Sequence, residues 1–375
     1  MKILMMQAGF SAGGAEKVMA ALAAHRAAQG DEVHVGAMTM GPEGSFFPYP
    51  PEVTLHVVGP RGKGGRFVQP RRALGTARLI RKLRPDLIVS FLTKVNCLTL
   101  FAATGSDIPV VISERNNPSA QSARFWRKFQ RKLMPRAAGI AMQTRDAAAD
   151  LPPAQQRRAH IIPNPCLPVD YTPAAPTDHC RFVAVGRLVE QKGFDMLIDA
   201  FAALPQDLDA TLDIFGQGHR ADTLQRQINS RGLEKRVRLA GLAGSAREWL
   251  GAGDALVVSS RYEGFCNVLA EATCSGLPAI GFDCPYSIGE MIHDGVNGLL
   301  VPDGDVPAMT AAMEKFARDA TLRKHLSSSP EIMASRLDPD RIMGLWDQLI
   351  DEAARGLSKS PVGSDLREDG IQLIE

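Results

Sequence analysis

The sequence predicts an α/β fold made of two Rossmann-like domains that face each other across a cleft. Short apolar runs rich in β-branched residues alternate with longer amphipathic segments, a pattern typical of parallel sheets covered by helices. The alternation occurs twice, in halves of similar size, and 375 residues suit two ordinary domains. We therefore expect domains at residues 1–168 and 169–340. Residues 341–375 are expected to supply a closing helix, to about 356 and able to pack back on the first domain, and then a polar tail.

The first half begins with a strand, a glycine-rich turn and a helix that ends at Gly30. This order is typical of the start of a doubly wound sheet. Residues 161–168 are expected to form the last strand and the linker to the second domain. The other strands are expected at 2–8, 31–39, 86–92, 108–113 and 138–144, and helices at 15–30, 72–84 and 123–136.

The second half repeats the alternation, and ligands of such sheets bind at the carboxyl ends of the strands. A helix over 338–354 is expected to close the fold, and residues 357–375 are polar with mixed charge and expected to fray. Strands are expected at 180–188, 210–216, 237–241 and 254–260, and helices at 195–204, 220–232, 246–253 and from about 268.

The composition is that of a globular protein, with 45% hydrophobic and 22% charged residues. No apolar run approaches the roughly 18 residues of a membrane helix, and residues 1–10 do not resemble a signal peptide. The six cysteines include no CxxC pair, so we expect reduced, buried thiols and a cytoplasmic protein.

Charge is distributed unevenly. Residues 1–168 carry a net charge of +13, and residues 169–375 carry −11. Two acid-free segments supply most of the excess, residues 53–85 with nine basic residues and residues 115–145 with eight. A basic half of this kind often binds an anionic partner.

The stretch RYEGFCNVLAEATCSGLPAI, residues 261–280, is the most informative part of the chain. A buried strand ends before it, Glu263 lies in the turn, and Glu271 lies about one turn inside the following helix. Free N–H groups and the positive end of the dipole make a helix N-terminus an anion site. A phosphate site between two carboxylates that accept from hydroxyls describes a nucleotide-sugar pocket. The alternative is one surface glutamate and one ordinary helix-face glutamate.

Five motifs carry a family resemblance, in this order: SAGGAEKV (11–18), GRLVEQKGFDMLIDAF (186–201), IFGQG (214–218), EGFCNVLAEATCSGLPAI (263–280) and GVNGLLVPDGD (295–305). Over residues 1–350 the chain resembles the family 4 retaining glycosyltransferases of the GT-B fold. It is similar to bacterial enzymes that extend lipid-linked oligosaccharides in polysaccharide and lipopolysaccharide assembly.

The resemblance implies roles for the donor-side residues. Arg187 and Lys192 would clamp the donor diphosphate, whose growing charge fixed cations stabilise; alone, each would pass for a solvated loop cation. Glu263 would face the donor sugar, and Glu271 would bond the ribose hydroxyls. The backbone N–H groups of Phe265, Asn267 and Val268 would meet the sugar and phosphate. Displacement would occur on the front side, without an enzyme nucleophile.

Two glycine pairs are weaker candidates for donor binding. Gly13 and Gly14 occupy the first strand-to-helix loop, and Gly216 and Gly218 lie in a later loop of the same kind. Glycine lets the backbone approach a phosphate or sugar closely. The alternative is a plain turn at each place.

Arg115 marks a departure from the family pattern, because many relatives carry a histidine after the fourth strand, near the transferred sugar. Arg115 could bind a sugar hydroxyl or an acceptor phosphate; the alternative is a basic surface residue. Asp303-Gly-Asp305 has the DxD form of metal-dependent glycosyltransferases, but it reads as turn chemistry. We expect no required metal and no cofactor.

A basic amphipathic helix is expected around residues 123–136. Trp126, Phe129 and Leu133 form an apolar stripe at i, i+3, i+7 spacing. Such a helix can bind an anionic membrane or a lipid-diphosphate acceptor; alternatively, its apolar face packs on the sheet and its charges are solvated. No nucleic-acid module is present. The acceptor-side cations are Arg127, Lys128, Arg131 and Lys132.

The resemblance implies a retaining hexosyl- or N-acetylhexosaminyltransferase. It would move a sugar from a nucleotide-sugar donor, a UDP-sugar first among them, to a glycan or polyprenyl-diphosphate-linked acceptor, with peripheral contact to the inner face of the cell membrane. Two alternatives stay open: a sugar-nucleotide epimerase of the same fold, and a non-catalytic nucleotide-sugar-binding protein.

Overall fold

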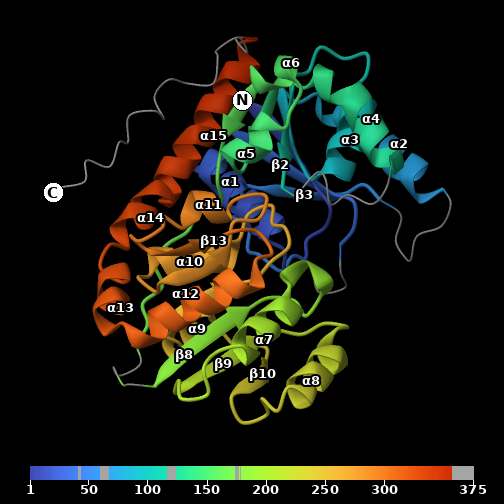
Figure 1. Ribbon diagram of the computed structural model, residues 1–375. Helices are drawn as coiled ribbons and strands as arrows, with labels where there is room; N and C mark the ends of the chain where they lie inside the picture. Colours follow the sequence, from blue (N-terminus) through green and yellow to red (C-terminus); the bar gives the residue numbers. More distant parts are fainter. Residues whose placement is uncertain (41–43, 60–66, 116–123, 174–176, 178, 357–375) are drawn as a thin grey trace. The chain divides into compact units, whose positions relative to one another are not determined.

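The computed structural model describes residues 1–40, 44–59, 67–115, 124–173, 177 and 179–356 (Figure 1). The chain forms two compact units. Unit 1 contains Met1–Pro163 and the C-terminal segment from Ile342, and unit 2 contains Asn164–Arg341. The first unit thus ends a few residues before the expected 168. The tail expected at 357–375 lies outside the described residues.

Unit 1 is built on a seven-stranded parallel sheet in the order β3-β2-β1-β4-β5-β6-β7. Strand order reverses after β1, as in a doubly wound sheet, and the predicted Rossmann-like architecture is confirmed for this half. The strands are β1 (Lys2–Gln7), β2 (Glu32–Ala37), β3 (Thr54–Val57), β4 (Leu87–Phe91), β5 (Val110–Glu114), β6 (Gly139–Met142) and β7 (Ala159–Ile161).

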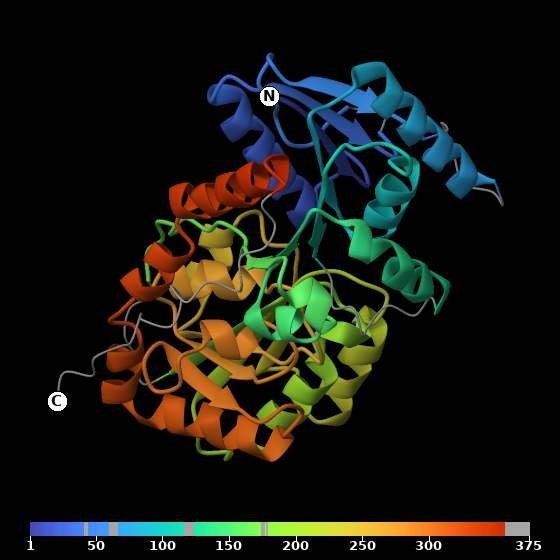
Figure 2. The ribbon, with the colours of Figure 1, turned by 90° about the horizontal axis from the view of Figure 1, so that it is seen from above.

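Helices cover both faces of this sheet. Right-handed crossovers place a helix on one face when the chain moves along the sheet in one direction and on the other face when it moves back. Accordingly α2, α3 and α4 lie together on the face opposite to α1 and α15 (Figure 2). The helices of unit 1 are α1 (Gly14–Ala28), α2 (Val68–Leu83), α3 (Thr93–Ala102), α4 (Arg124–Leu133), the 3-10 turn η1 (Met134–Arg136), α5 (Arg145–Ala149), α6 (Pro153–Gln156) and, after unit 2, α15 (Pro339–Ala354).

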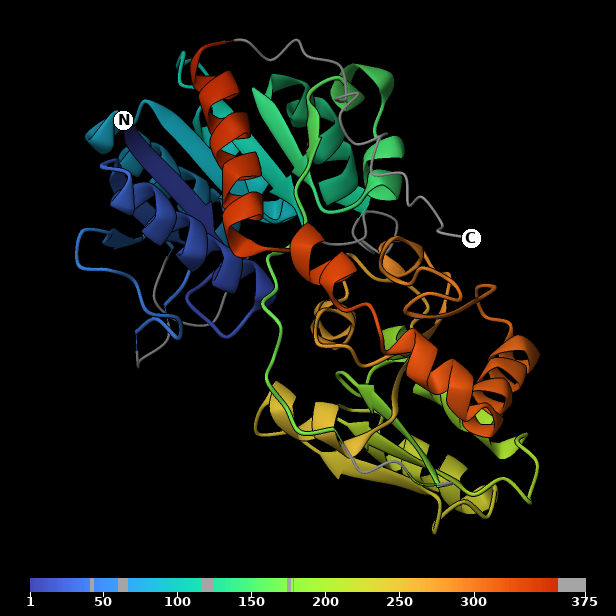
Figure 3. The same ribbon diagram turned by 90° about the vertical axis from the view of Figure 1, so that its left-hand side faces the viewer.

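Helix α15 is part of the core of unit 1, although it comes from the far end of the chain (Figure 3). Trp346 is fully buried, and its ring stacks on Phe91 at 5.4 Å between centroids. Met19 and Leu22 of α1 and Ile342 of α15 belong to the same buried cluster. This face of the sheet therefore depends on α15 for its burial from water.

The expectation of a strand at 161–168 is wrong. Strand β7 ends at Ile161; Ile162 N still donates to Met142 O of β6 at 2.7 Å, but the residues after it belong to no strand. Pro163, Pro165 and Pro168 lack the N–H that a ladder requires, so the prolines that made this segment look like a linker also exclude it from the sheet.

Unit 2 contains a six-stranded parallel sheet in the order β10-β9-β8-β11-β12-β13. Its strands are β8 (Cys180–Val185), β9 (Ala210–Phe215), β10 (Val237–Gly241), β11 (Ala255–Val258), β12 (Ala279–Phe282) and β13 (Gly298–Val301). Its helices are η2 (Glu190–Lys192), α7 (Phe194–Ala202), α8 (Ala221–Ser230), α9 (Ala246–Ala252), α10 (Asn267–Cys274), α11 (Ile288–Met291), α12 (Val306–Arg318), α13 (Ala320–Leu326) and α14 (Glu331–Arg336).

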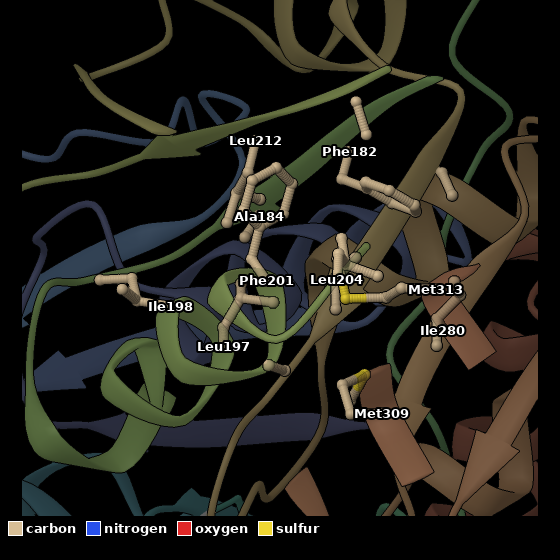
Figure 4. Packing of buried hydrophobic residues seen from close by; sticks show 14 of the residues in the cluster. Phe182, Ala184, Leu197, Ile198, Phe201, Leu204, Leu212, Ile280, Met309 and Met313 are labelled. Carbon is tan, nitrogen blue, oxygen red and sulfur yellow. The ribbon is translucent and has the colours of Figure 1, made fainter. Parts of the chain in front are cut away.

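Two hydrophobic cores lie on the two faces of this sheet. Successive side chains of a strand point to opposite faces, so Phe182 of β8 packs in one core and Val183 in the other. The first core includes Phe201 of α7 and Met309 and Met313 of α12 (Figure 4). The second surrounds α10, and this buries Leu269 completely. Because α10 is anchored in this core, its N-terminus has a fixed position at the carboxyl ends of the strands.

Candidate active site

The loop that follows β8 carries Arg187 and Lys192, and the loop that follows β9 holds it in place. Gly186 N donates to Phe215 O at 2.9 Å, and Leu188 N donates to Gln217 O at 2.8 Å. These two bonds flank Arg187 on both sides. The position of Arg187 is therefore set by backbone contacts between two loops at the carboxyl edge of the sheet.

Gly216 is required by this loop-to-loop contact. Its φ is +145°, and a Cβ there would lie 1.8 Å from Gly186 O. A Cβ at Gly218 would lie 2.3 Å from Leu188 O. The predicted close approach at these glycines is thus an approach to the neighbouring loop of the same unit. Donor binding by Gly216 and Gly218 stays a prediction.

Lys192 and Glu263 form a buried ion pair. The Lys192 Nζ lies 2.6 Å from Glu263 Oε1, and the two side chains are only 15% and 6% exposed. The Ser260 hydroxyl donates to the same oxygen at 2.6 Å. Both bonds end on Oε1, so Oε2 of Glu263 accepts no hydrogen bond from the described part of the chain. That oxygen can accept from a hydroxyl of a bound sugar.

Lys192 keeps its charge in this buried position. Burial acts to lower the pKa of Lys192, but the charge of the Glu263 carboxylate and the bond to it outweigh burial, so the pKa lies above its usual value of 10.5. The ammonium is therefore present at neutral pH without a full shell of water. A desolvated fixed cation interacts with a developing anion more strongly than a solvated one does.

Arg187 complements this pair with a guanidinium that is exposed to solvent. It makes no ion pair with any residue that the structure describes. The neighbouring Gly186 lies against the Lys192 side chain, because a Cβ at Gly186 would be 3.0 Å from Lys192 Cε. An uncompensated cation next to a buried one attracts an anionic group to this edge of the sheet.

The N-terminus of α10 adds hydrogen-bond donors to the same unit. The backbone N–H groups of Phe265, Asn267 and Val268 donate no hydrogen bond within the described ranges. The side-chain oxygen of Asn267 accepts from Asn164 Nδ2 at 2.7 Å. This bond uses the side chain of Asn267 and not its backbone N–H. Free donors at the positive end of a helix dipole can bind phosphate oxygens.

Glu271 lies in the second turn of α10, half-buried, as its position in the sequence predicts. Helical side chains tilt toward the N-terminus of their helix, so the Glu271 carboxylate is directed toward that end of α10. Unit 2 thus brings together Arg187, Lys192, Glu263 and Glu271 and the donors of α10. Its cations and free N–H groups can bind a diphosphate, and its carboxylates can accept from hydroxyls.

Sequence reasoning missed the residues that support this site. Arg261 forms two bonds to the Asp195 carboxylate, at 2.8 and 2.7 Å, and a third to Glu190 O at 2.9 Å. These bonds tie the segment that contains Glu263 to the loop that contains Lys192. Ser260 was also missed. Arg261 and Ser260 adjoin the motif on its N-terminal side, which is the only sequence signal that could have found them.

Gly13 and Gly14 lie in unit 1, at the start of α1. The buried Glu16 side chain folds back over this loop, so that a Cβ at Gly13 would lie 2.0 Å from Glu16 Oε2. A carboxylate of the chain itself therefore occupies the position next to the α1 N-terminus. This disfavours a phosphate there and leaves a sugar hydroxyl as the better partner for these glycines.

Arg115 is not the basic surface residue that we considered as an alternative. It is 8% exposed, its Nε donates to Ser113 Oγ at 3.0 Å, and its guanidinium lies 4.2 Å from the Phe91 ring centroid. Burial lowers the pKa of Arg115 to about 9, so it stays protonated at neutral pH. Acceptor binding by Arg115 stays a prediction.

Glu114, the neighbour of Arg115, is held by a buried network that the sequence did not predict. Thr93 Oγ1 donates to Glu114 Oε2 at 2.6 Å, and Asn96 Nδ2 donates to Oε1 at 2.8 Å. Burial raises the pKa of Glu114, while bonds from Thr93, Asn96 and Gln130 oppose that rise. The network fixes the end of β5, from which Arg115 projects.

The basic helix exists as α4, but its apolar stripe faces inward. Leu133 is buried, and the Phe129 ring packs 6.0 Å from that of Phe101 on α3. The stripe therefore packs against α3 of unit 1, whereas the alternative interpretation placed it on the sheet. Lys128, Arg131 and Lys132 are exposed, and so is Phe125, which lies outside the stripe. The side chain of Arg127 lies outside the described residues.

The DxD sequence performs the turn chemistry that we expected of it. Asp305 is the N-cap of α12, and its Oδ1 accepts from Ala308 N at 2.9 Å. Among the residues that the structure describes, no group of three histidine, cysteine, aspartate or glutamate side chains could hold a metal ion. Whether activity needs a metal stays a prediction.

Family models match both halves of the chain. Residues 13–165 match a glycosyl transferase 4-like domain, and residues 179–319 match the glycosyl transferases group 1. An exopolysaccharide phosphotransferase of Streptomyces coelicolor is 32% identical over 52% of this chain and 21% of its own length. The lipopolysaccharide core biosynthesis glycosyltransferase LpsE of Rhizobium meliloti is 33% identical over 47% of this chain and 51% of its own. The chain thus spans about half or less of the length of these curated relatives.

Solved structures match over nearly the whole chain and at low identity. The sucrose-phosphate synthase of Thermosynechococcus elongatus has a TM-score of 0.80 at 18% identity, covering 94% of this chain and 98% of its own. The HepE protein of Anabaena in complex with UDP and glucose has a TM-score of 0.77 at 21% identity, covering 94% of this chain and 100% of its own. Both show the same fold.

Proposed function

Because this chain belongs to the group 1 glycosyl transferases and has their GT-B fold, we propose that it moves a sugar from a nucleotide-sugar to a glycan or lipid-linked acceptor. The observation that carries the proposal is the buried Lys192–Glu263 pair beside the exposed Arg187 and the free N–H groups of α10. This set combines a binding site for two phosphates with a carboxylate that can accept from a hydroxyl.

The chemistry follows from the charges. When the bond between the sugar and the diphosphate breaks, negative charge grows on the leaving diphosphate. Arg187, Lys192 and the α10 N–H groups stabilise that charge without reorganising, because contacts within the chain already hold them in place. No metal is required for this step.

We propose that the sugar keeps its anomeric configuration. Glu263 is a poor nucleophile, because Oε1 is engaged by Lys192 and Ser260. The bond from the sugar to the diphosphate breaks, the acceptor hydroxyl attacks on the same face, and its proton passes to the departing diphosphate oxygen, which accounts for retention. Glu263 holds the sugar through Oε2, and Glu271 accepts from the ribose hydroxyls.

A UDP-sugar is the proposed donor, and a hexose or N-acetylhexosamine the proposed sugar. The Anabaena protein with the same fold was crystallised with UDP and glucose, which supports this choice. The name of the Rhizobium relative supports an acceptor of the lipopolysaccharide or polysaccharide type. A polyprenyl-diphosphate-linked acceptor would place the enzyme at the cytoplasmic face of a membrane.

Release of the nucleotide tests the proposal. UDP-, GDP- and ADP-glucose and UDP-N-acetylglucosamine are each offered with and without a polyprenyl-diphosphate-linked oligosaccharide. Acceptor-dependent release of UDP, with an anomeric proton coupling in the product that matches the donor, supports a retaining transferase. Conversion of the donor sugar without acceptor would indicate an epimerase. Donor binding seen by thermal shift without turnover would indicate a binding protein.

A further inference from the structure

Three neighbouring helices of unit 1 contain no acidic residue. Helices α2, α3 and α4 together carry eleven lysines and arginines and no aspartate or glutamate. They lie side by side on one face of the sheet (Figure 2). The face formed by α2, α3 and α4 is called the basic layer below. Its positive charge comes from three consecutive helices that the fold places on one face of the sheet.

The exposed cations of the basic layer lack acidic partners among the residues that the structure describes. Lys128, Arg131 and Lys132 of α4 are exposed, as are Arg78 and Lys82 of α2. None of them forms an ion pair with another described residue. On the opposite face, by contrast, Arg26 of α1 pairs with carboxylates at 2.6 and 2.8 Å. The basic layer therefore projects an uncompensated positive field into solvent.

Exposed aromatic rings accompany these charges. Phe125 of α4 is 67% exposed and Phe101 of α3 is 53% exposed. Both rings pack on Phe129, with centroid distances of 5.8 and 6.0 Å. The two helices thus present a joined aromatic cluster to solvent. Exposing aromatic rings of this size to water is unfavourable in free energy, and burial in an apolar phase would be favourable.

We propose that the basic layer docks on an anionic phospholipid bilayer, with the Phe125 and Phe101 rings in the interface and the cations of α2 and α4 among the lipid phosphates. Unpaired cations beside exposed aromatic rings match the charge and the polarity gradient of such a surface. A protein partner would need a surface of many carboxylates and few cations, because α2, α3 and α4 offer it no acidic residue. A nucleic acid would pair its phosphates with the cations, but it would not bury the Phe125 and Phe101 rings in an apolar phase.

The docked helix is tied to the interior of unit 1. Gln130 of α4 hydrogen-bonds the buried carboxyl of Glu114, which immediately precedes Arg115. Docking therefore fixes the helix that helps to hold the end of β5.

Flotation with vesicles tests the docking. Vesicles of phosphatidylcholine alone and vesicles with about a third phosphatidylglycerol are mixed with the whole protein, without donor or acceptor. Wild type should bind the anionic vesicles only, and salt should weaken binding because it screens exposed charges. Changing Lys128, Arg131 and Lys132 together to Gln should lower the partition coefficient by roughly 100-fold, since each cation near the surface contributes about fivefold.

Matched controls separate docking from general charge. Arg226, Lys235 and Lys315 of unit 2 are also exposed, and changing all three to Gln removes the same charge but should leave binding near wild type. Phe125→Ala should weaken binding, whereas Leu167→Ala, at a site 65% exposed, should not. Thermal unfolding must show that all variants are folded.

Two results would overturn the proposal. The first is failure of folded wild type to bind anionic vesicles. The second is equal binding by wild type and the triple variant of α4. Dimerisation that the α4 substitutions abolish, seen by sedimentation without any vesicle binding, would assign the basic layer to a second copy instead. Because no turnover is measured, these outcomes are distinct from a failure of the proposed transferase activity.

Discussion

The Lys192 ammonium and the Glu263 carboxylate lie 2.6 Å apart, although they are 71 residues apart in the sequence. One side chain comes from the loop after β8 and the other from the loop after β11, and these two strands are neighbours in the parallel sheet. The pair is shielded from water, so removing either side chain leaves the other charged and buried without a partner, which lowers stability. The candidate diphosphate cation and the candidate sugar-binding carboxylate therefore act as one unit.

Arg187 and Lys192 are expected to differ in what their loss does to stability. Both Arg187→Ala and Lys192→Ala should lower turnover by about 100-fold or more, the scale of one lost transition-state contact. Lys192→Ala should in addition destabilise the fold by about 3–5 kcal/mol, because it leaves Glu263 charged and buried without its partner. Arg187→Ala should leave the unfolding temperature unchanged, because its guanidinium is exposed. Steady-state kinetics and thermal unfolding of both variants check this.

Ser260→Ala serves as the control for that comparison. It removes one bond to Glu263 Oε1 but leaves the ion pair, so it should cost about 1–3 kcal/mol of stability and less activity than either cation. Near-normal turnover of Arg187→Ala at saturating donor would remove the diphosphate clamp from the mechanism.

Asp347 is expected to make the stability of unit 1 depend on pH. Burial acts to raise its pKa, but bonds from His25, Arg26 and Gln29 prevail, and the pKa lies below its usual 3.8. A carboxyl with a depressed folded pKa stabilises the fold above its unfolded pKa and loses that contribution as pH falls through the folded value. Asp347→Asn should therefore lower stability by about 2 kcal/mol at pH 7, with a difference from wild type that shrinks below pH 3.8.

Asp351→Asn is the matched control on the same helix. Asp351 is more exposed, and its nearest cations lie 3.8 and 3.7 Å away, so the substitution should change stability little at either pH. Denaturation of the three proteins from pH 7 to pH 3 measures the effect. A constant difference between Asp347→Asn and wild type across that range would show that the carboxylate charge is not involved.

The donor-side residues could be predicted from the sequence because they lie in local motifs. Lys192 follows Arg187 within one loop, and Glu271 follows Glu263 across one turn, so spacing alone puts each pair at a strand end. The contact between the two pairs could not be predicted in this way. It depends on the pairing of β8 with β11, which no local pattern encodes.

The burial of Arg115 could not be predicted from its local sequence. Its neighbours in the sequence are polar and acidic, which is typical of a surface segment. Its burial comes from Phe91 and from Trp346, whose ring lies 5.6 Å from the guanidinium. Trp346 lies on α15, more than 200 residues later in the chain. Likewise, the stripe of α4 packs inward because α3 offers Phe101, which helical periodicity alone does not reveal.

Two glycines are expected to respond to alanine in opposite directions. Gly344 is exposed in the middle of α15, and a Cβ there meets nothing within 4 Å. Gly344→Ala should therefore raise the free energy of unfolding by up to about 1 kcal/mol. Gly216→Ala should lower it and reduce turnover, because the Cβ would collide with Gly186 O and displace the loop of Arg187. Chemical denaturation and kinetics measure both effects. A Gly216→Ala enzyme with wild-type kinetics would contradict the role of this loop contact.

Activity is expected to survive removal of divalent metal ions. In the proposed function Arg187 and Lys192 neutralise the diphosphate in place of a metal, and the Asp305 carboxylate is occupied as the cap of α12. Turnover in EDTA should therefore equal turnover in Mg²⁺ or Mn²⁺.

Asp303→Asn with Asp305→Asn should keep both activity and fold, since asparagine caps a helix about as well as aspartate. Asp305→Ala should cost about 1 kcal/mol of stability through the lost cap, with little loss of turnover. If EDTA abolishes activity and Mn²⁺ restores it in wild type but not in the double asparagine variant, the DxD sequence binds a metal and the cap is a secondary role.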